Sequence, residues 1–239
     1  MLIDRLAPSR RPRGSAWGFQ RWRRLLFMHW PVPVEAMRAA VPESFELDLH
    51  EGVSYVGVVP FEMEGVRPRF LPEVAALAFP ETNVRTYVLR NGEPGVYFFS
   101  LEALSRLAVA TARAAFSLPY HHARMSLREN DGIVHYVTER TATGVRHEVR
   151  YRIGEFLGPS SPGTLEHFLL ERYLLFTERR GAPFRGQVHH APYPAHRAEV
   201  LDVSDQLVFA AGLPALRGMP TYAHYSPGVD VEVFALERA

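Results

Sequence analysis

The sequence predicts one domain of the α+β class, built mainly from antiparallel strands that form a barrel or a strongly curved sheet with a few flanking helices. Short segments of alternating apolar and polar residues recur along the chain, and hairpin turns such as residues 91–95 and 129–132 separate them. Only residues 101–116 have the length and composition of a long helix. We expect the domain to span residues 16–239. Residues 1–15 are rich in arginine and proline, which predicts a mobile basic tail.

The individual elements follow from local patterns. Alternation and a high content of β-branched and aromatic residues predict strands, and turn residues separate them. Helices are expected where apolar residues recur every three to four positions and where serine or proline can begin the first turn. The expected strands are 45–49, 53–61, 83–89, 96–99, 125–128, 133–139, 146–153, 220–225 and 229–236, and the expected helices are 33–41, 101–116, 161–172 and 203–211.

The composition excludes several kinds of chemistry. All 27 basic residues are arginine, and the chain contains neither lysine nor cysteine. Arginine stays protonated and cannot act as a neutral amine. A lysine Schiff base, a thiolate nucleophile and a disulfide are therefore impossible. The formal net charge of +1 gives no reason to expect nucleic acid as a partner.

The segment 79–88, FPETNVRTYV, is the most informative candidate site. Alternate residues of a strand face the same side, so Glu81, Asn83, Arg85 and Tyr87 share one face. An acid, an amide, a guanidinium and a phenol together could bind a carboxylate or carbonyl and supply a titratable group. The alternative is the solvent-facing side of an ordinary amphipathic strand.

Histidines supply the remaining candidates. His189 and His190 are adjacent, so in a strand only one of them can enter a given pocket. Tyr120 precedes a second histidine pair, and His224 could form a site with Asp230 near the C-terminus. The alternatives are structural histidines and a final strand with an exposed acidic face. We expect no metal site, because no His-x-x-x-His or His-x-His spacing is present.

Other functional signatures are missing from the sequence. It contains no G-x-S-x-G elbow, no Gly-rich dinucleotide fingerprint after a strand and, without lysine, no P-loop. Basic and aromatic residues are not interleaved in the way that binds single-stranded nucleic acid. The apolar run at residues 25–30 is too short for a signal sequence or a membrane span. We therefore expect a cytoplasmic protein with a small-molecule ligand, no cofactor, no nucleic-acid or membrane partner, and possible homo-oligomers.

Seven motifs together resemble the YqjF-like family of uncharacterised bacterial proteins, which is grouped by fold with acetoacetate decarboxylase. They are HWPVP at 29–33, VGVVPFEMEGVRPR at 56–69, FPETNVRTYV at 79–88, GVYFFSL at 95–101, LLERYLLFT at 169–177, VHHAPYP at 188–194 and HYSPGVDV at 224–231. The resemblance implies a closed or cone-like antiparallel β barrel with flanking helices and a central pocket. Acetoacetate decarboxylase forms a Schiff base through a lysine, so the absence of lysine here excludes that decarboxylation.

Three hypotheses for function remain. The first is a site for an organic acid or carbonyl compound inside the barrel, where Arg85 grips a carboxylate and Glu81 transfers protons with a histidine such as His189. The second is a non-catalytic binding or sensing module whose pocket is lined by aromatic residues such as Phe61 and Phe98. The third is a metal-dependent enzyme that uses His189 or His190, His224 and an acid.

Overall fold

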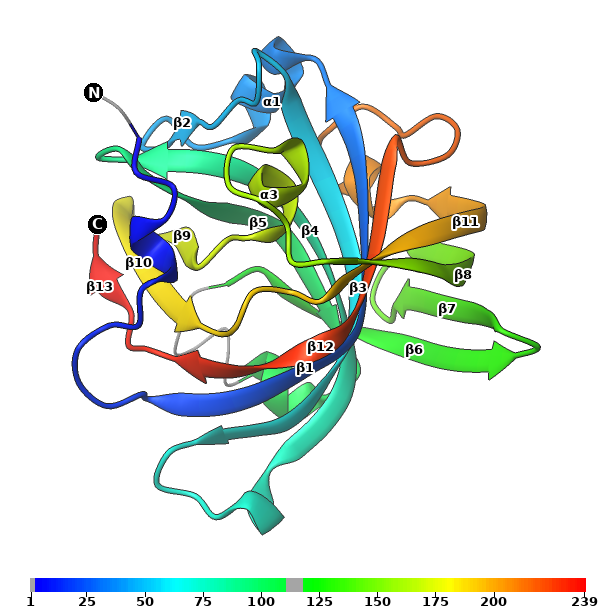
Figure 1. The fold of residues 1–239 in the computed structure, drawn as a ribbon, viewed down its shortest axis with the longest axis horizontal. Helices are drawn as coiled ribbons and strands as arrows, with labels where there is room; N and C mark the ends of the chain where they lie inside the picture. Colours follow the sequence, from blue (N-terminus) through cyan, green and yellow to red (C-terminus); the bar gives the residue numbers. More distant parts are fainter. Residues whose placement is uncertain (1–2, 111–117) are drawn as a thin grey trace.

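The computed structural model describes residues 3–110 and 118–239, most of which lie in strands (Figure 1). The strands of this described part form one sheet. They are β1 (Gly18–Val32), β2 (Glu46–Leu47), β3 (Ser54–Pro68), β4 (Leu77–Arg90), β5 (Glu93–Ala103), β6 (Tyr120–Asn130), β7 (Ile133–Arg140), β8 (Arg146–Gly158), β9 (Leu174–Arg179), β10 (Ala182–His189), β11 (Ala195–Asp205), β12 (Tyr222–Val233) and β13 (Glu237–Arg238).

The helices are few and short. Those that lie wholly within the described residues are α1 (Val34–Ala40), α3 (Leu165–Leu170) and α4 (Leu207–Ala210), with 3-10 turns η1 (Ala7–Ser9) and η2 (Glu73–Ala75). Thr164 caps α3 by accepting a hydrogen bond from the backbone N–H of His167. No helix in the described ranges is long and apolar enough to cross a membrane.

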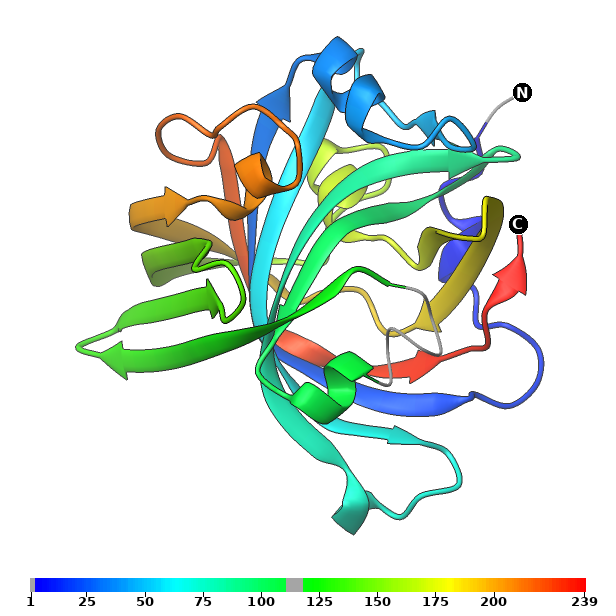
Figure 2. The same ribbon diagram turned by 180° about the vertical axis from the view of Figure 1, so that it is seen from behind.

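The sheet closes on itself. Its strand order is β13-β10-β9-β5-β6-β7-β8-β11-β12-β1-β3-β4-β2, and additional pairings of β10 with β12 and of β5 with β4 complete a ring. Neighbouring strands are antiparallel except that β5 pairs in parallel with β6 and with β9. Figure 2 shows the hairpin of β6 and β7 projecting to one side, while the long strands β3 and β4 bend through the middle of the molecule. The expected strand-rich fold with few helices is confirmed.

The central strands bury both of their faces. One face packs into a cluster that we call the interior, which includes Phe27, Phe61, Tyr87, Tyr120, Phe168 and Tyr193. The opposite face packs into a second cluster, in which Val58 and Val84 of β3 and β4 join Tyr136 and Val149 of β7 and β8. A strand with two buried faces does not show the apolar–polar alternation of a surface strand.

The long helix expected at residues 101–116 is partly wrong. Leu101 and Ala103 belong to β5, where they pair with Asn83 and Glu81 of β4 and in parallel with β6. Helical structure begins at residue 106, and residues 111–117 lie outside the described part of the chain. The other expected helices are shorter than predicted, because residues 203–205 continue β11 and only Leu165–Leu170 of 161–172 is α-helical.

The N-terminal segment, expected to be a mobile tail, lies against the body of the molecule. Arg5 makes two hydrogen bonds of 2.6 Å to the carboxylate of Asp48, and Arg11 makes two of 2.6 and 2.8 Å to Glu232. Between them, Gln187 donates to the carbonyl oxygens of Pro8 and Arg10. Two-pronged arginine–carboxylate pairs of this kind are geometrically specific, so they define where the segment lies.

The parallel pairing of β5 with β9 leaves no room for a side chain at Gly95. A Cβ there would lie 2.6 Å from Cε2 of Phe176 and 2.7 Å from the carbonyl oxygen of Leu174. We expect Gly95→Ala to lower the free energy of unfolding by about 1–3 kcal/mol or more, since the backbone carbonyl must move. Gly144→Ala is the control, because its surroundings are open and only its φ of +72° is unfavourable. Urea unfolding of both variants checks this, and an equal loss in the two would contradict it.

Candidate functional site

The four polar residues of β4 face the interior and not the solvent. Glu81, Asn83, Arg85 and Tyr87 are all buried, with exposed fractions of 3, 5, 8 and 1%. Their neighbours on the other face are buried as well, since Thr82 exchanges a hydrogen bond of 2.7 Å with Thr138 of β7. The alternative that these four residues face solvent is therefore wrong. An acid, an amide and a guanidinium lie in the interior among aromatic rings.

Glu81 is a buried carboxyl group with a phenol as its partner. Tyr120, on β6, donates a hydrogen bond of 2.8 Å to its Oε2. Burial, together with the smaller effect of the nearby charge of Glu102, raises the pKa of Glu81 to about 8, against the opposing effect of this hydrogen bond. At neutral pH Glu81 is therefore mainly the uncharged acid, which can donate a proton or a hydrogen bond.

Arg85 is a buried arginine without a carboxylate. Its Nη2 donates to the carbonyl oxygen of Leu169 at 3.0 Å, its Nε has no hydrogen-bond partner, and its guanidinium lies 5.4 Å from the ring centre of Phe27. No carboxylate of the described residues forms an ion pair with it. Among these residues the other buried arginines are paired, Arg140 with Glu102 and Arg172 with Asp48, both at 2.7 Å. Burying a charge without a counter-charge costs free energy. The guanidinium of Arg85 is therefore a candidate for binding an anion.

Tyr87 belongs to a structural network at the α3 end of the interior. Its hydroxyl donates to the carbonyl oxygen of Leu169 at 2.7 Å and accepts from Nε2 of His29 at 2.7 Å. Burial, followed by the charge of Arg85, lowers the pKa of His29 well below its usual value, so its ring is neutral. Sequence reasoning missed His29 as a site residue, because it stands in an apolar run and the motif HWPVP that it begins indicates a family and not a chemical role.

The adjacent histidines point in opposite directions. His190 is buried in the interior, where its ring stacks on Tyr173 at a centroid distance of 4.6 Å and lies 4.7 Å from Tyr193 and 5.6 Å from Trp22. His189 faces the N-terminal segment, and its Nδ1 lies 3.1 Å from the carbonyl oxygen of Ser9. The expected catalytic role of His189 is not supported by this placement, because strand alternation turns it away from Glu81.

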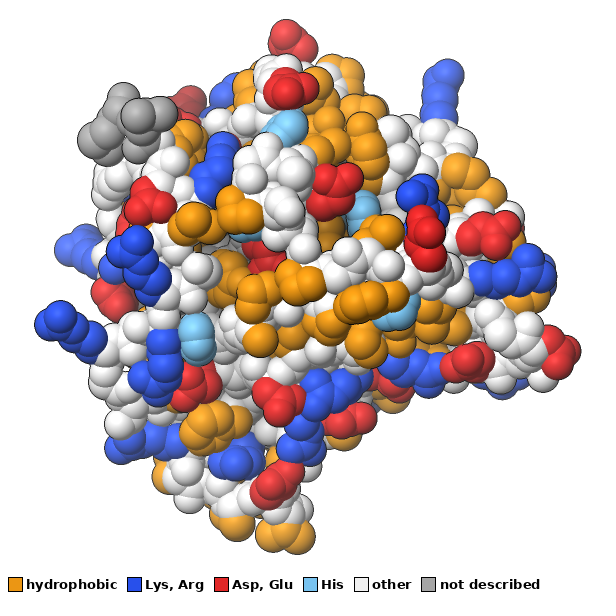
Figure 3. Space-filling model, in the orientation of Figure 1, with side chains coloured by type: hydrophobic (Ala, Val, Ile, Leu, Met, Phe, Trp, Pro, Cys, Tyr) orange, Lys and Arg blue, Asp and Glu red, His pale blue; other side chains and the backbone are white. Residues whose placement is uncertain are grey.

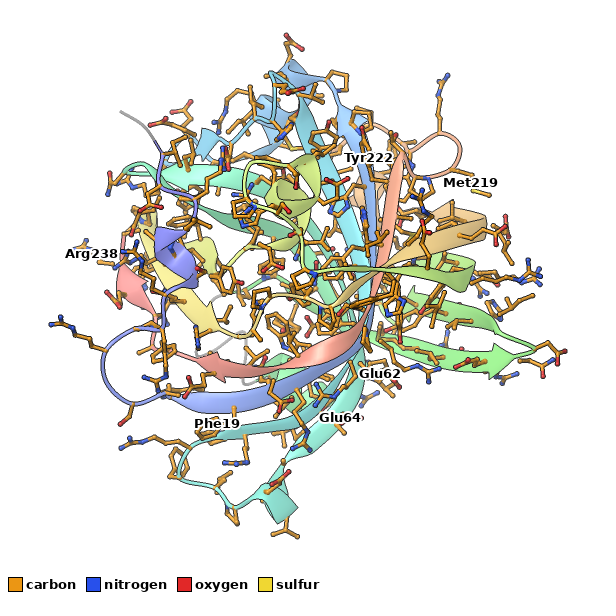
Figure 4. The ribbon with its side chains drawn as sticks, viewed as in Figure 1. Phe19, Glu62, Glu64, Met219, Tyr222 and Arg238 are labelled. Carbon is orange, nitrogen blue, oxygen red and sulfur yellow. The ribbon has the colours of Figure 1, made fainter. Side chains whose placement is uncertain are left out.

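The C-terminal candidates are separated. His224 is buried near His29, whose pKa it lowers, and Tyr222 from the same strand, labelled in Figure 4, packs against Tyr55 at 6.1 Å. Asp230 lies on the surface, with its side chain 78% exposed and paired with Arg23 at 2.5 Å. Val229 and Val231 face the interior, so alternation places Asp230 outside. A joint site of His224 and Asp230 is therefore wrong.

The interior brings together Glu81, Asn83, Arg85, Tyr87, Tyr120 and His190 from the sequence-predicted set. Three of their buried polar atoms have no hydrogen-bond partner: Oδ1 of Asn83, Nε of Arg85 and Nε2 of His190. Nine other buried side-chain atoms of the described residues, such as Nη2 of Arg172, also lack a partner, so an unpaired atom alone does not mark the site. The residues that sequence reasoning missed are the aromatic ones, Trp22, Phe27 and Tyr193. Among the described residues, no group of three or more His, Asp or Glu side chains is placed to hold a metal ion.

The outer surface is less suited to binding a small anion than the interior is. Figure 3 shows arginine and carboxylate side chains interspersed across one face of the molecule. A surface groove of about 570 Å³ is lined by residues that include Arg11, Arg69, Phe19 and Phe70. Arg11 is already paired with Glu232, which also lines the groove, and Arg69 is exposed to solvent, which screens its charge.

Comparisons with known proteins place the chain in a family. Residues 19–230 match the model of the DUF2071 family, described as an uncharacterized conserved protein. The chain is 37% identical to the uncharacterized protein YqjF of Bacillus subtilis over 221 residues, which are 92% of this chain and 91% of that protein.

Two solved structures share the fold. Acetoacetate decarboxylase from Legionella pneumophila superposes with a TM-score of 0.66 at 11% identity, covering 99% of this chain and 94% of that one. The enduracididine biosynthesis enzyme MppR, solved in complex with pyruvate, superposes with a TM-score of 0.65 at 11% identity. The match covers 95% of this chain and 91% of that one. At this identity the likeness establishes an acetoacetate decarboxylase-like fold and nothing about activity. The chain belongs to the DUF2071 family.

Proposed function

We propose that this protein binds a small organic acid with a carbonyl group inside the closed, cone-like barrel that its ring of strands forms, and that Arg85 holds the carboxylate. The observation that carries the proposal is the buried guanidinium of Arg85, which has a backbone carbonyl and aromatic rings around it but no described carboxylate. A bound carboxylate would supply the missing charge and accept the hydrogen bond of Nε.

The other groups of the interior suit the rest of such a ligand. Glu81 in its acid form can donate to a carbonyl oxygen, and Oδ1 of Asn83 and Nε2 of His190 can accept hydrogen bonds. Buried aromatic side chains such as Phe27, Phe61 and Tyr193 belong to the same cluster, and apolar and aromatic surroundings are expected of a small-molecule site. The pyruvate bound to MppR, which has the same fold, supports the choice of a short oxo acid as a probe.

Access to the interior requires a side chain to move, because the unpartnered atoms are shielded from water. Trp22 is the side chain best placed for this. It is only partly buried at the edge of the interior, and its ring packs against both Phe61, at 6.1 Å, and His190, at 5.6 Å. Its rotation would open a path beside both residues.

Calorimetric titration with acetate, pyruvate, 2-oxobutyrate and benzoate tests the proposal. We expect saturable binding of at least one acid, and a loss of affinity of about 100- to 4000-fold in Arg85→Met, since truncating one partner of a buried charge pair costs about 3–5 kcal/mol. Arg69→Ala is the control, because Arg69 lines the open groove and should not affect binding. Binding that survives in Arg85→Met, or the absence of binding for every acid, would refute the proposal.

A further inference from the structure

The ring of strands around the interior is closed by two short pairings. β1 and β12 pair over most of their length, but β10 and β12 share two residue pairs, and so do β5 and β9. The β5–β9 pairing is covered, because Phe176 of β9 is buried in the second cluster. We call the β10–β12 junction the seam, and it consists of Val188 opposite Val233 and His189 opposite Glu232. A pairing of two residues is held by few backbone hydrogen bonds, so local opening of the ring is expected at the seam.

The N-terminal segment crosses the outer side of the seam, where it contacts β10 first (Figure 1). Gln187 of β10 donates to the carbonyl oxygens of Pro8 and Arg10 at 2.8 and 3.2 Å. Nδ1 of His189 lies 3.1 Å from the carbonyl oxygen of Ser9. Because alternate residues of a strand face opposite sides, both side chains point away from the interior that Val188 faces.

The next residue of the segment contacts the other strand of the seam. Arg11 donates to both carboxylate oxygens of Glu232 at 2.6 and 2.8 Å. Glu232 lies on β12 directly opposite His189, and its neighbour Val231 faces the interior. Four consecutive residues, 8–11, therefore tie β10 to β12 from the outside.

The contacts of this segment are of a kind that can be broken without unfolding the sheet. Of residues 3–15, Pro8 alone is buried. The side chains of Arg11 and Glu232 are 42 and 28% exposed, so water can replace their hydrogen bonds. The firmest anchor is Arg5, whose partner Asp48 is buried away from the seam. A segment with few buried apolar contacts can detach locally while the strands beneath it stay folded.

We propose that residues 8–11 act as a strap across the seam, and that their release lets β10 separate from β12 and opens the interior. His190 directly follows β10, and the ring of Trp22 packs against it at 5.6 Å. Movement of β10 therefore also frees Trp22 at the edge of the interior. The strap governs entry whatever ligand the interior holds, so the inference goes beyond the proposed function.

The reaction rate of a buried thiol measures this opening. The chain has no cysteine, so one introduced thiol gives a signal without background. Val231→Cys places it on β12 beside the seam, at a position that is 2% exposed and faces the interior. Val149→Cys places it in the second cluster, on β8, at a position that is 0% exposed. Val188→Cys, on the other strand of the seam, is a second probe. Each thiol is reacted with dithiobis(nitrobenzoate) in the otherwise wild-type chain.

The double substitution Arg11→Ala with Gln187→Ala releases the strap, because it removes contacts to both strands of the seam. We expect the thiols of Val231→Cys and Val188→Cys to react at least about 10-fold faster in this background, since the reaction follows the population of the open form. The thiol of Val149→Cys should keep its rate. Arg124→Ala is the matched control, because it removes an exposed ion pair of 2.7 Å with Glu139 on the β6–β7 hairpin. It should leave all three rates unchanged.

Two results would overturn the inference. Faster reaction of the Val149→Cys thiol together with the others would mean that the whole protein is destabilised and not opened at the seam. Unchanged rates at Val231→Cys and Val188→Cys would mean that the segment does not control the seam. No acid is added in this experiment, so failure of the strap leaves anion binding at Arg85 untouched, and failure of anion binding leaves the strap untouched.

Discussion

Arg85→Met is expected to leave the free energy of unfolding within about 1 kcal/mol of wild type, or to raise it, because it removes a buried charge that has no counter-charge to lose. Leu169 keeps the hydrogen bond from Tyr87, so its carbonyl oxygen is not left unpaired. The hydrophobic volume of methionine also fits the aromatic surroundings. Unfolding in urea at pH 7, followed by circular dichroism, measures the difference.

Arg140→Met is the matched comparison and should behave oppositely. Arg140 is buried to the same degree, but its Nε and Nη2 donate to Oε1 of Glu102 at 2.9 and 2.7 Å. Its removal leaves a buried carboxylate without a cation, so we expect a loss of about 3–5 kcal/mol. Equal destabilisation in the two variants would mean that Arg85 has a structural role, and it would remove the reason to place an anion there.

Glu81→Gln is expected to change how stability depends on pH. The pKa of Glu81 is raised in the folded state from 4.5 to about 8, so the folded state holds a proton that the unfolded state releases. The contribution of protonated Glu81 to the free energy of unfolding is fully present below pH 4.5 and is lost as pH rises toward 8. Because a tenfold change in an acid dissociation constant corresponds to about 1.4 kcal/mol, the loss is on the order of several kcal/mol. The variant should therefore be similar to wild type at pH 5 and clearly more stable than wild type at pH 9.

Urea midpoints of both proteins at half-unit steps from pH 5 to pH 9 check this expectation. His190 changes the free energy of unfolding in the opposite direction with pH. Because its pKa is lowered to about 4 in the folded state, the stability that its neutral ring contributes is lost as pH falls below 6.5. That effect is present in both proteins and cancels in their difference. Parallel curves over the whole range would show that Glu81 titrates normally and that its carboxyl is ionised at neutral pH.

The sequence could place residues on faces but could not say which face lies inside. Alternation correctly grouped Glu81, Asn83 and Arg85, yet the same pattern fits a solvent-facing strand. What decides the matter is the layer formed by β7 and β8, which covers the other face through contacts such as Thr82 with Thr138. That layer depends on pairings between distant segments, which local periodicity does not reveal.

The histidines show the same limit. Alternation predicted that only one of His189 and His190 enters a pocket, but the choice between them depends on how β10 pairs with β9 and β12. The end of β5 was mistaken for helix for a related reason. Leu101 and Ala103 have side chains that favour a helix, and their partners on β6 pair in parallel across a long connection. Tertiary pairing of this kind routinely overrides local propensity.

A crystal structure with the tightest-binding carboxylate is the decisive test of anion binding at Arg85. We predict a carboxylate oxygen about 2.7–3.1 Å from Nε of Arg85, the usual length of a charged hydrogen bond, with the ligand carbonyl directed toward Glu81. A carboxylate found instead beside Arg69 in the open groove, with the surroundings of Arg85 unchanged, would contradict this prediction.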